Sequence, residues 1–347
     1  MNIAVLMGGI SPERNVSING GLSVAQALRA KGHDVVVVDP AFGKNGIVQE
    51  LESTNMSVFP DIEDLMKFDT KKYIECINSE IFDGIDLAFI VLHGINGEDG
   101  KIQALLELRG IPYTGSGIKA SSVAIDKLSS KMLFLAAGIS TPPWSVIRKK
   151  DFDNYDFFKE IRSELGNKLV IKPNNQGSTV GISIVKDGNL DDIHQGIMNA
   201  SKYSDIVLIE QFIEGREITV GVLKGEALPV IEIITSEGFY DYNHKYTKGN
   251  TQYICPAEIS EDIEEFTQSL AVSAYNVIDC RGVARADFRL SDEGQPFLLE
   301  INTIPGFTET SLVPMAAKEV DLNFADLCEE LVNIALNNNS INEEDDE

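Results

Sequence analysis

The stretch "FLLEINTIPG", residues 297–306, is an apolar strand that carries polar groups at its end. Glu300 and Asn302 are two residues apart, and because side chains alternate along a strand they lie on the same face. The Pro-Gly pair at 305–306 ends the strand directly afterwards. An acid and an amide side by side on an apolar strand indicate a feature other than plain core packing.

The nearby stretch "VARADFRL", residues 283–290, supplies a second carboxylate at a strand position. Asp287 follows Arg285 by two residues and therefore shares its face. With Glu300 and Asn302 it makes a hard-oxygen set that suits Mg²⁺ or Mn²⁺. The alternative is a solvated strand face with an incidental salt bridge. The flanking apolar residues count against that alternative, since an unpaired buried carboxylate costs several kcal/mol.

The composition is that of a globular, strongly acidic protein: 43% of its 347 residues are hydrophobic, and its formal net charge is −25. Such a surface repels nucleic acid and anionic lipid, so we expect neither as a partner. No apolar run reaches the roughly 18–20 residues of a membrane span, and the N-terminus does not resemble a signal peptide. The four cysteines are scattered without a CxxC pair, which predicts reduced thiols in a cytoplasmic protein.

The first third of the chain has the pattern of an α/β domain. The segments "NIAVLMGG" (2–9), "DVVVVDP" (34–40) and "DLAFIVLHG" (86–94) are buried strands with helical segments between them. This alternation predicts a parallel sheet over residues 1–115. The part from about 41 to 84 has no clear motif and predicts one or two surface helices and a short strand.

The pattern changes after residue 115. A long helix is predicted for "KASSVAIDKLSSKMLFLAAG" (119–138), and strands then follow in close succession. Closely spaced strands favour antiparallel sheets, so the remainder is predicted to be α+β. We expect a small central unit over 116–209, a C-terminal unit over 210–340, and a disordered acidic tail over 341–347.

Two lysines are candidate phosphate ligands. Lys172 ends an apolar strand, and the loop after it contains Gly177 and Gly181. Glycine-rich loops expose backbone N–H groups and approach phosphates closely. The loop is not a Walker A sequence, and a simple turn would explain its glycines without explaining Lys172. Lys127, in "AIDKLSSK", is the second candidate, although a lone helical lysine is more often solvated.

Two further segments suggest a nucleotide and a lid. Glu210 ends a strand and Glu217 follows seven residues later, so the connecting backbone could meet an adenine and a carboxylate could accept ribose hydroxyls. The polar segment "FYDYNHKYTKGNTQYICPA" (239–257) carries Lys245 and Tyr246. A loop of this length predicts a lid that excludes water from a hydrolysable intermediate.

The order of these motifs resembles that of the ATP-grasp ligases and, within them, closely resembles the D-alanine–D-alanine ligase family. The similarity runs in order from "VLMGGISPERNVS" through "VLHGINGEDG", "GIPYTGSG", "AIDKLSSK" and "VIKPNNQGSTVG" to "LLEINTIPGFTETSLVP". It implies a Rossmann-like N-terminal domain, a small central α+β domain and a C-terminal α+β domain. It also implies ATP-dependent joining of two D-alanines through an acyl phosphate, with release of ADP and phosphate, in peptidoglycan synthesis.

The resemblance also implies roles for individual residues. The nucleotide would be bound by Lys127, Lys172, Glu210, Ile213, Glu217 and Lys245. Two Mg²⁺ or Mn²⁺ ions would be held by Asp287, Glu300 and Asn302. The first D-alanine would meet Glu13 and His93, and a hydrogen-bonded set would join Glu13 to Ser178 and Tyr246. The oxyanion would be stabilised by Arg285 and the backbone at Gly306, and the second carboxylate would be held by Ser311 and the Leu312 amide. The family also implies a homodimer.

Some alternatives stay open. The proton of the attacking amine could go to bound phosphate or to the set around Tyr246. Gln211 and Thr310 stand where relatives often have lysine and histidine, so adenine contacts and the second pocket could differ in detail. An enzyme making a D-alanine–D-lactate ester is the nearest rival, and Tyr246 counts against it because that type tends to have histidine there. A dinucleotide-dependent oxidoreductase would have a GxGxxG fingerprint, which this sequence lacks. A catalytically inactive paralogue would have lost a metal ligand or a phosphate-binding lysine, and this chain keeps all of these residues.

Overall fold

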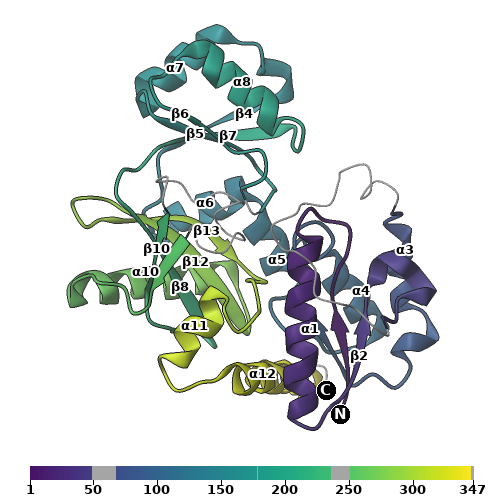
Figure 1. Cartoon of the computed structure of the whole chain (residues 1–347). Coiled ribbons are helices and arrows are strands. Elements are labelled where there is room, and N and C mark those ends of the chain that lie inside the picture. The colour runs from purple at the N-terminus through teal and green to yellow at the C-terminus, as the bar shows by residue number, and fades with distance from the viewer. Residues whose placement is uncertain (49–67, 178, 236–250, 345–347) are drawn as a thin grey trace.

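The computed structural model describes residues 1–48, 68–177, 179–235 and 251–344, and it contains three separate sheets. Figure 1 shows a central unit at the top and two larger bodies side by side below it. Three predicted site residues, Ser178, Lys245 and Tyr246, lie outside the described residues. Within the described residues, no helix is long and apolar enough to cross a membrane.

The N-terminal unit is built on a parallel sheet, as predicted. Its strands are β1 (Asn2–Leu6), β2 (Asp34–Val38) and β3 (Leu87–Ile90), in the order β2-β1-β3. Both faces of β1 are buried, because Ile3 and Val5 join one core cluster while Ala4 and Leu6 join another. The unit is completed by α1 (Arg14–Ala30), α3 (Lys71–Ile77) and α4 (Lys101–Arg109), with short 3-10 turns η1 (Pro40–Asn45) and η2 (Glu80–Phe82).

The long helix predicted for 119–138 is two helices, α5 (Ile118–Ile125) and α6 (Lys127–Ala136). Asp126 between them has an extended backbone and accepts a hydrogen bond from the Ser129 N–H at 2.8 Å. An aspartate that caps the next helix in this way ends the helix before it. The single-helix prediction was therefore wrong at Asp126, and the break places Lys127 in the first turn of α6.

The central unit is an antiparallel sheet covered by helices. Its strands are β4 (Trp144–Arg148), β5 (Leu169–Pro173), β6 (Ser183–Val185) and β7 (Ile206–Gln211), in the order β4-β7-β5-β6. The helices α7 (Tyr155–Leu165) and α8 (Leu190–Ala200) lie above the sheet in Figure 1, and η3 (Lys149–Asp151) follows β4. The unit has its own core, which includes Ile147, Phe158 and Ile193.

The C-terminal unit contains the largest sheet, and β12 (Val283–Leu290) is one of its interior strands. The main path runs β11 (Thr251–Ile254), β10 (Ile231–Thr235), β8 (Arg216–Leu223), β12 and β13 (Pro296–Asn302), and β9 (Glu226–Ala227) pairs with β8. Every pairing is antiparallel, as predicted, and β12–β13 is irregular between Asp287 and Phe288. The unit also contains the helices α10 (Glu261–Ile278), which comes between β11 and β12, and α11 (Leu312–Lys318) and α12 (Phe324–Glu344), which come after β13.

Packing between the units bears on their boundaries. Ala124 of α5 and Phe134 of α6 share a core cluster with Leu298 of β13, so these helices pack with the C-terminal sheet. The division at 115/116 and 209/210 remains a proposal, and this packing favours a central unit that begins after α6. The helix α12 continues to Glu344, four residues into the segment expected to be a disordered tail.

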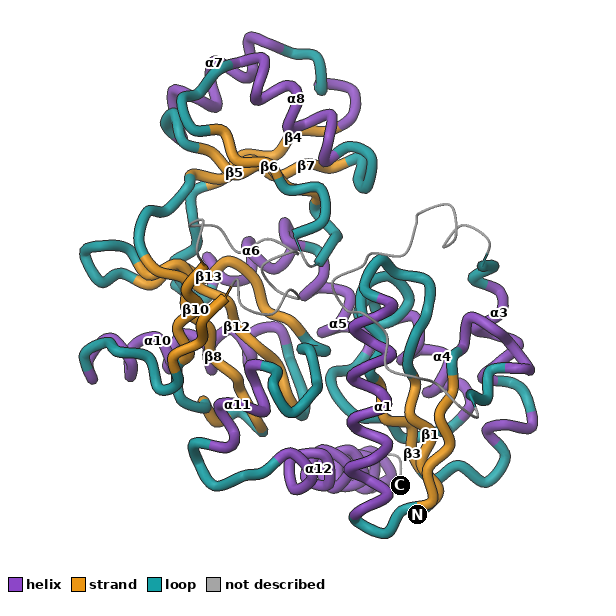
Figure 2. The backbone as a smooth tube through the Cα atoms, viewed as in Figure 1, coloured by secondary structure: helices purple, strands orange, loops and turns teal. Residues whose placement is uncertain are grey.

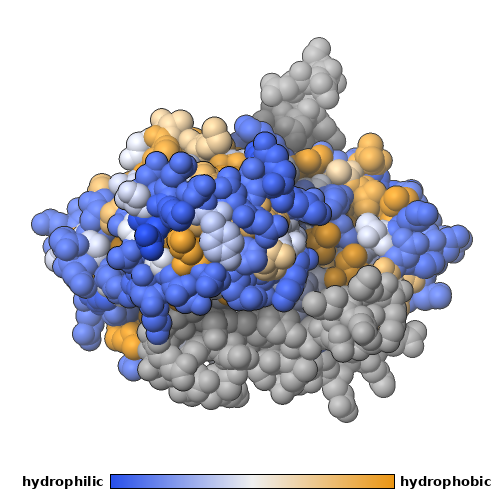
Figure 3. Space-filling model, turned by 90° about the horizontal axis from the view of Figure 1, so that it is seen from above, coloured by the Kyte–Doolittle hydropathy of each residue, from blue (hydrophilic) through white to orange (hydrophobic). Residues whose placement is uncertain are grey.

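The last helix also packs on the first unit. Leu28 of α1 and Leu327 and Leu331 of α12 belong to one cluster that also contains β1 and β3 residues. The tube view shows α12 beside α1 at the base of the molecule (Figure 2). The N- and C-terminal units therefore share one continuous core, whereas the central unit stands above them. Seen from above, the described surface is mainly hydrophilic with small hydrophobic groups (Figure 3).

Candidate active site

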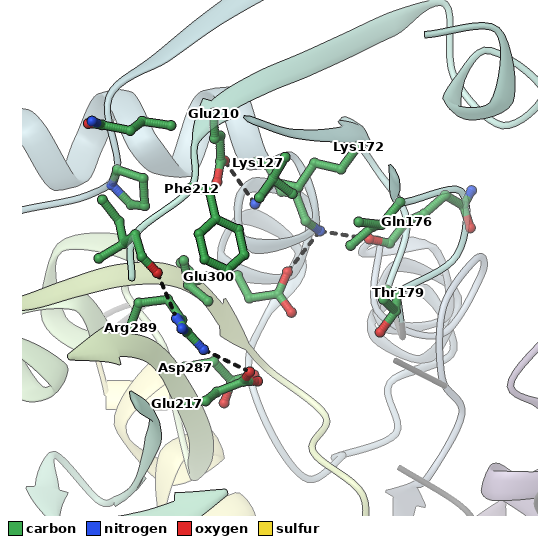
Figure 4. A pocket seen from close by; sticks show the side chains of 17 residues that line it. Lys127, Lys172, Gln176, Thr179, Glu210, Phe212, Glu217, Asp287, Arg289 and Glu300 are labelled. Atoms are coloured by element: carbon green, nitrogen blue, oxygen red, sulfur yellow. Dashed lines mark hydrogen bonds and ion pairs between the residues drawn. The ribbon is translucent and has the colours of Figure 1, made fainter. Parts of the chain in front are cut away.

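A cleft lies between the central and C-terminal sheets, with about 820 Å³ of space when the part open to solvent is included. Figure 4 shows its side chains converging from both units. Every described residue predicted to bind the nucleotide lines it, together with two of the predicted metal ligands: Lys127, Lys172, Glu210, Ile213, Glu217, Asp287 and Glu300. The cleft thus brings together residues that are far apart in the sequence.

Lys127 lies where α6, β13 and the loop after β5 meet. Its ammonium is 2.9 Å from Glu300 Oε2 and donates to the Gln176 carbonyl at 2.6 Å. The start of α6 is tied to that loop, because the Asn174 carbonyl accepts from the Lys127 N–H at 3.0 Å and the Asn174 amide donates to Asp126 at 2.7 Å. These contacts fix a buried cation at the edge of the cleft, which suits an anionic ligand.

Glu210 is buried between two lysines. Its Oε1 lies 2.8 Å from the Lys172 ammonium and 3.1 Å from the Lys131 ammonium. Burial raises the pKa of Glu210, but Lys131 and Lys172 outweigh it and leave this pKa below its usual value. Lys131 was not predicted from the sequence as a site residue; it follows Lys127 by four residues on α6 and so lies on the same helix face.

The other end of the cleft is shaped by Arg289 and the turn after β7. Arg289 donates to the carbonyls of Ile213 at 3.1 Å and Gly215 at 2.7 Å, and its guanidinium is 3.7 Å from Glu217. Phe212 lines the cleft, and its ring lies near Arg289 (Figure 4). This end offers an aromatic face, backbone groups and a carboxylate, which suit an adenosine. Arg289, too, was not predicted from the sequence as a site residue.

The predicted metal ligands lie on neighbouring strands. Asp287 is directly opposite Glu300 in the β12–β13 pair. Both Asp287 oxygens accept from Arg285 at 2.8 Å, and Thr219 donates to Oδ1 at 2.6 Å. Asn302 is opposite Arg285 and accepts from the Ile304 N–H at 3.0 Å, which turns the chain after the strand.

This donor set fits a hard divalent cation. Two carboxylates and an amide oxygen on neighbouring strands offer the ligand types that Mg²⁺ takes, usually together with phosphate oxygens. In the described part of the chain, no three Asp, Glu, His or Cys side chains gather as a metal cluster. The Asn302 amide and nucleotide phosphates would therefore have to complete the ligand set.

A second polar group surrounds Glu13, which immediately precedes α1 and is buried. A Cβ on Gly177 would lie 3.1 Å from Glu13 Oε2, and a Cβ on Gly94 would lie 3.4 Å from it. These glycines therefore permit the close approach of the two loops to the carboxylate. The arrangement places Glu13 where the N-terminal unit meets the loop after β5 of the central unit.

His93 and Glu98 lie close to Glu13. The pKa of His93 lies below its usual value, mainly because the side chain is buried; Arg285 also lowers it, whereas Glu13 raises it. The His93 Nε2 has no hydrogen-bond partner in the described chain. Burial, reinforced by Glu13, raises the pKa of Glu98 to about 8, and its carboxylate accepts from the Gly94 N–H at 2.6 Å. Glu98 was missed because "INGEDG" reads as an ordinary turn.

The residues predicted for the second substrate also come together. Ser311 precedes α11, and its hydroxyl accepts from the Thr308 N–H at 2.9 Å. A Cβ on Gly306 would lie 3.5 Å from that hydroxyl, so Gly306 and Ser311 are neighbours. Leu312 is the first residue of α11 and is buried. Gly306, Thr308 and Ser311 thus lie together in the loop that follows β13 directly.

A central antiparallel sheet facing a C-terminal antiparallel sheet, across a cleft of lysines and acids, defines an ATP-grasp ligase. Models of the "D-ala D-ala ligase" N-terminus and C-terminus match residues 2–116 and 133–333. The chain belongs to the D-alanine–D-alanine ligase family.

Individual relatives agree with this assignment. The D-alanine–D-alanine ligase of Syntrophotalea carbinolica is 42% identical over 331 residues, which covers 95% of this chain and 94% of the relative. The crystal structure of the Bacillus anthracis enzyme is similar with a TM-score of 0.76 at 32% identity, covering 97% of this chain and 98% of that one. Its complex with ATP gives 0.73 at 28% identity, with 97% of each chain covered.

Proposed function

We propose that this chain joins two molecules of D-alanine into D-alanyl-D-alanine, with ATP converted to ADP and phosphate. The observation that carries the proposal is one continuous polar site. Lys127 at the nucleotide cleft is paired with Glu300, and both Glu300 and Glu13 raise the pKa of the buried Glu98. The phosphate end of the cleft therefore adjoins the group around Glu13 and His93, where an amino acid would be activated.

The reaction has two steps. The first D-alanine carboxylate attacks the γ-phosphorus, the bond to ADP breaks, and an acyl phosphate forms. The amine of the second D-alanine then attacks the acyl carbon, and phosphate leaves as the peptide bond forms. Two anions must meet in the first step, so cations at the phosphates lower the barrier by neutralising charge. Lys127 and Lys172 are placed for that task in this proposal.

The substrate roles in this proposal are those that the family resemblance implies. Glu13 accepts the ammonium of the first D-alanine, and His93 lies beside it. Arg285 and the backbone at Gly306 stabilise the oxyanion of the tetrahedral intermediate. Ser311 and the Leu312 N–H hold the carboxylate of the second D-alanine. Ser178, Lys245 and Tyr246 keep the roles that the family resemblance implies.

Metal ions and assembly form the finer part of the proposal. Asp287, Glu300 and Asn302 would hold two Mg²⁺ or Mn²⁺ ions, which supply charge neutralisation at the ATP phosphates. Glu300 and Asp287 pair with the cationic side chains of Lys127 and Arg285 respectively, and these pairings support the proposal that both acids meet positive charge. We further expect a cytoplasmic homodimer.

The test is a ligase assay with purified chain, ATP, Mg²⁺ and single amino acids. ADP release should depend on D-alanine, and mass spectrometry should detect the dipeptide. L-alanine is the matched control for stereochemistry. D-lactate or D-serine supplied with D-alanine tests the second pocket. A dominant ester product at neutral pH, or ADP release that ignores D-alanine, would contradict the proposal.

A further inference from the structure

A fully buried lysine lies behind the nucleotide cleft. The Lys131 side chain is 0% exposed, and its ammonium lies 3.1 Å from Glu210 Oε1. The ammonium also donates to the Thr141 hydroxyl and lies 5.4 Å from the centre of the Trp144 ring. Lys131 is not among the residues that line the cleft, whereas Glu210 and Lys172 are. Lys131 therefore has no direct access to a nucleotide.

Glu210 has two cationic partners that differ in their surroundings. Its Oε1 is 2.8 Å from Lys172, which faces the cleft, and 3.1 Å from Lys131, which does not. Glu210 itself is only 2% exposed. A carboxylate buried to this degree needs a partner charge, because an unpaired buried charge is strongly unfavourable. If one lysine leaves Glu210, the other must stay.

This difference suggests separate roles for the two lysines, and the argument rests on the proposed function. In that function Lys172 contacts the ATP phosphates. We propose that Lys131 is a positioning residue for nucleotide binding, which remains the counter-ion of Glu210 when Lys172 moves to the phosphates. Thr141 and the surrounding core hold Lys131 in place, so Lys172 is the exchangeable partner.

In a chain that lacks Lys131, movement of Lys172 to the phosphates would leave Glu210 buried and unpaired. Lys172 would therefore stay on Glu210, and the phosphates would lose one cation. The adenine and ribose contacts would not change, because they come from the turn after β7. A lysine that merely filled space would instead affect every ligand of the cleft equally.

The experiment compares the binding of ADP and adenosine by calorimetry to the full chain and to Lys131→Met. We expect ADP binding to weaken about tenfold or more and adenosine binding to change by less than about twofold. Lys172→Met should show the same selective loss. The double variant Lys131→Met/Lys172→Met should lose no more than Lys172→Met does, because both changes remove one contact. Lys159→Met, in an exposed pair with Asp156, is the matched control and should bind both ligands normally.

Three results would overturn the proposal: unchanged ADP binding in Lys131→Met, equal weakening of ADP and adenosine, or additive losses in the double variant. If Lys131→Met does not fold, Glu210→Gln and Lys131→Met/Glu210→Gln are compared instead. With an uncharged residue at 210, both should bind ADP equally, and a tenfold difference between them would refute the proposal. None of these measurements needs ligase turnover. Failure to make the dipeptide would therefore refute the proposed function separately.

Discussion

Replacement of Lys131 by methionine removes a buried ammonium and keeps an unbranched side chain. The pKa of Lys131 is lowered from 10.5 to about 8, mainly by burial; Glu210 opposes this shift, and Lys172 and Lys127 contribute to it. The folded protein therefore releases this proton at lower pH than the unfolded chain does. Between these two values the unfolded chain binds more protons, so the free energy of unfolding increases with pH.

The size of this effect follows from the two pKa values. Between about pH 7.5 and about pH 9.5, the wild type should gain about 2 kcal/mol of stability that Lys131→Met cannot gain. Urea unfolding measures it through the fluorescence of Trp144, the only tryptophan of the chain, which lies beside Lys131. Groups far from Lys131 titrate equally in both proteins, so the difference reports Lys131 together with the charges coupled to it. A difference that stays constant within about 0.5 kcal/mol across this range would refute the reasoning.

Three further perturbations test the site. Glu300→Gln removes a proposed metal ligand and the partner of Lys127, so D-alanine-dependent ADP release should fall about a hundredfold or more; unchanged turnover would sink the metal assignment. Glu217→Gln should bring the KM values for ATP and 2′,3′-dideoxy-ATP closer together, because the dideoxy nucleotide lacks the ribose hydroxyls from which Glu217 is proposed to accept hydrogen bonds. An unchanged ratio of these KM values would contradict a role for Glu217 at the ribose. Gly215→Ala should lower the melting temperature more than Gly166→Ala. Both glycines have positive φ, but only a Cβ at 215 would lie 2.1 Å from a backbone oxygen; equal losses would contradict this.

The sheets were predictable because their signals are local. Continuous apolar runs at 2–9, 34–40 and 86–94 indicate strands buried on both faces, and the structure confirms the parallel sheet. The closely spaced strands around Asp287 and Glu300 likewise form the expected antiparallel pair. The helix break at Asp126 was missed because no Pro or Gly marks it. The available signal was Asp126 itself, because an aspartate can cap the helix that follows it by accepting a hydrogen bond from the N–H three residues later.

The missed site residues have partners that are distant in the sequence. Lys131 looks like any helical lysine until β7 brings Glu210 against it. Arg289 appears to be an alternating strand residue, and its acceptors lie in the turn at 213–215. The packing of α12 on α1 has the same character, since it joins opposite ends of the chain. The motifs predicted the residues that we propose to touch ligands, whereas the residues that hold them in place could be found only from the fold.

The shared core of α1 and α12 has a consequence for synthesis on the ribosome. Leu28 is synthesised long before its partners Leu327 and Leu331. The first sheet cannot bury its α12-facing side until α12 has been made. The middle of the chain is different, because the core from Ile147 to Ile209 is contiguous in the sequence. Domains usually fold in order from the N-terminus, but here the central unit has all its core residues available before the N-terminal unit does.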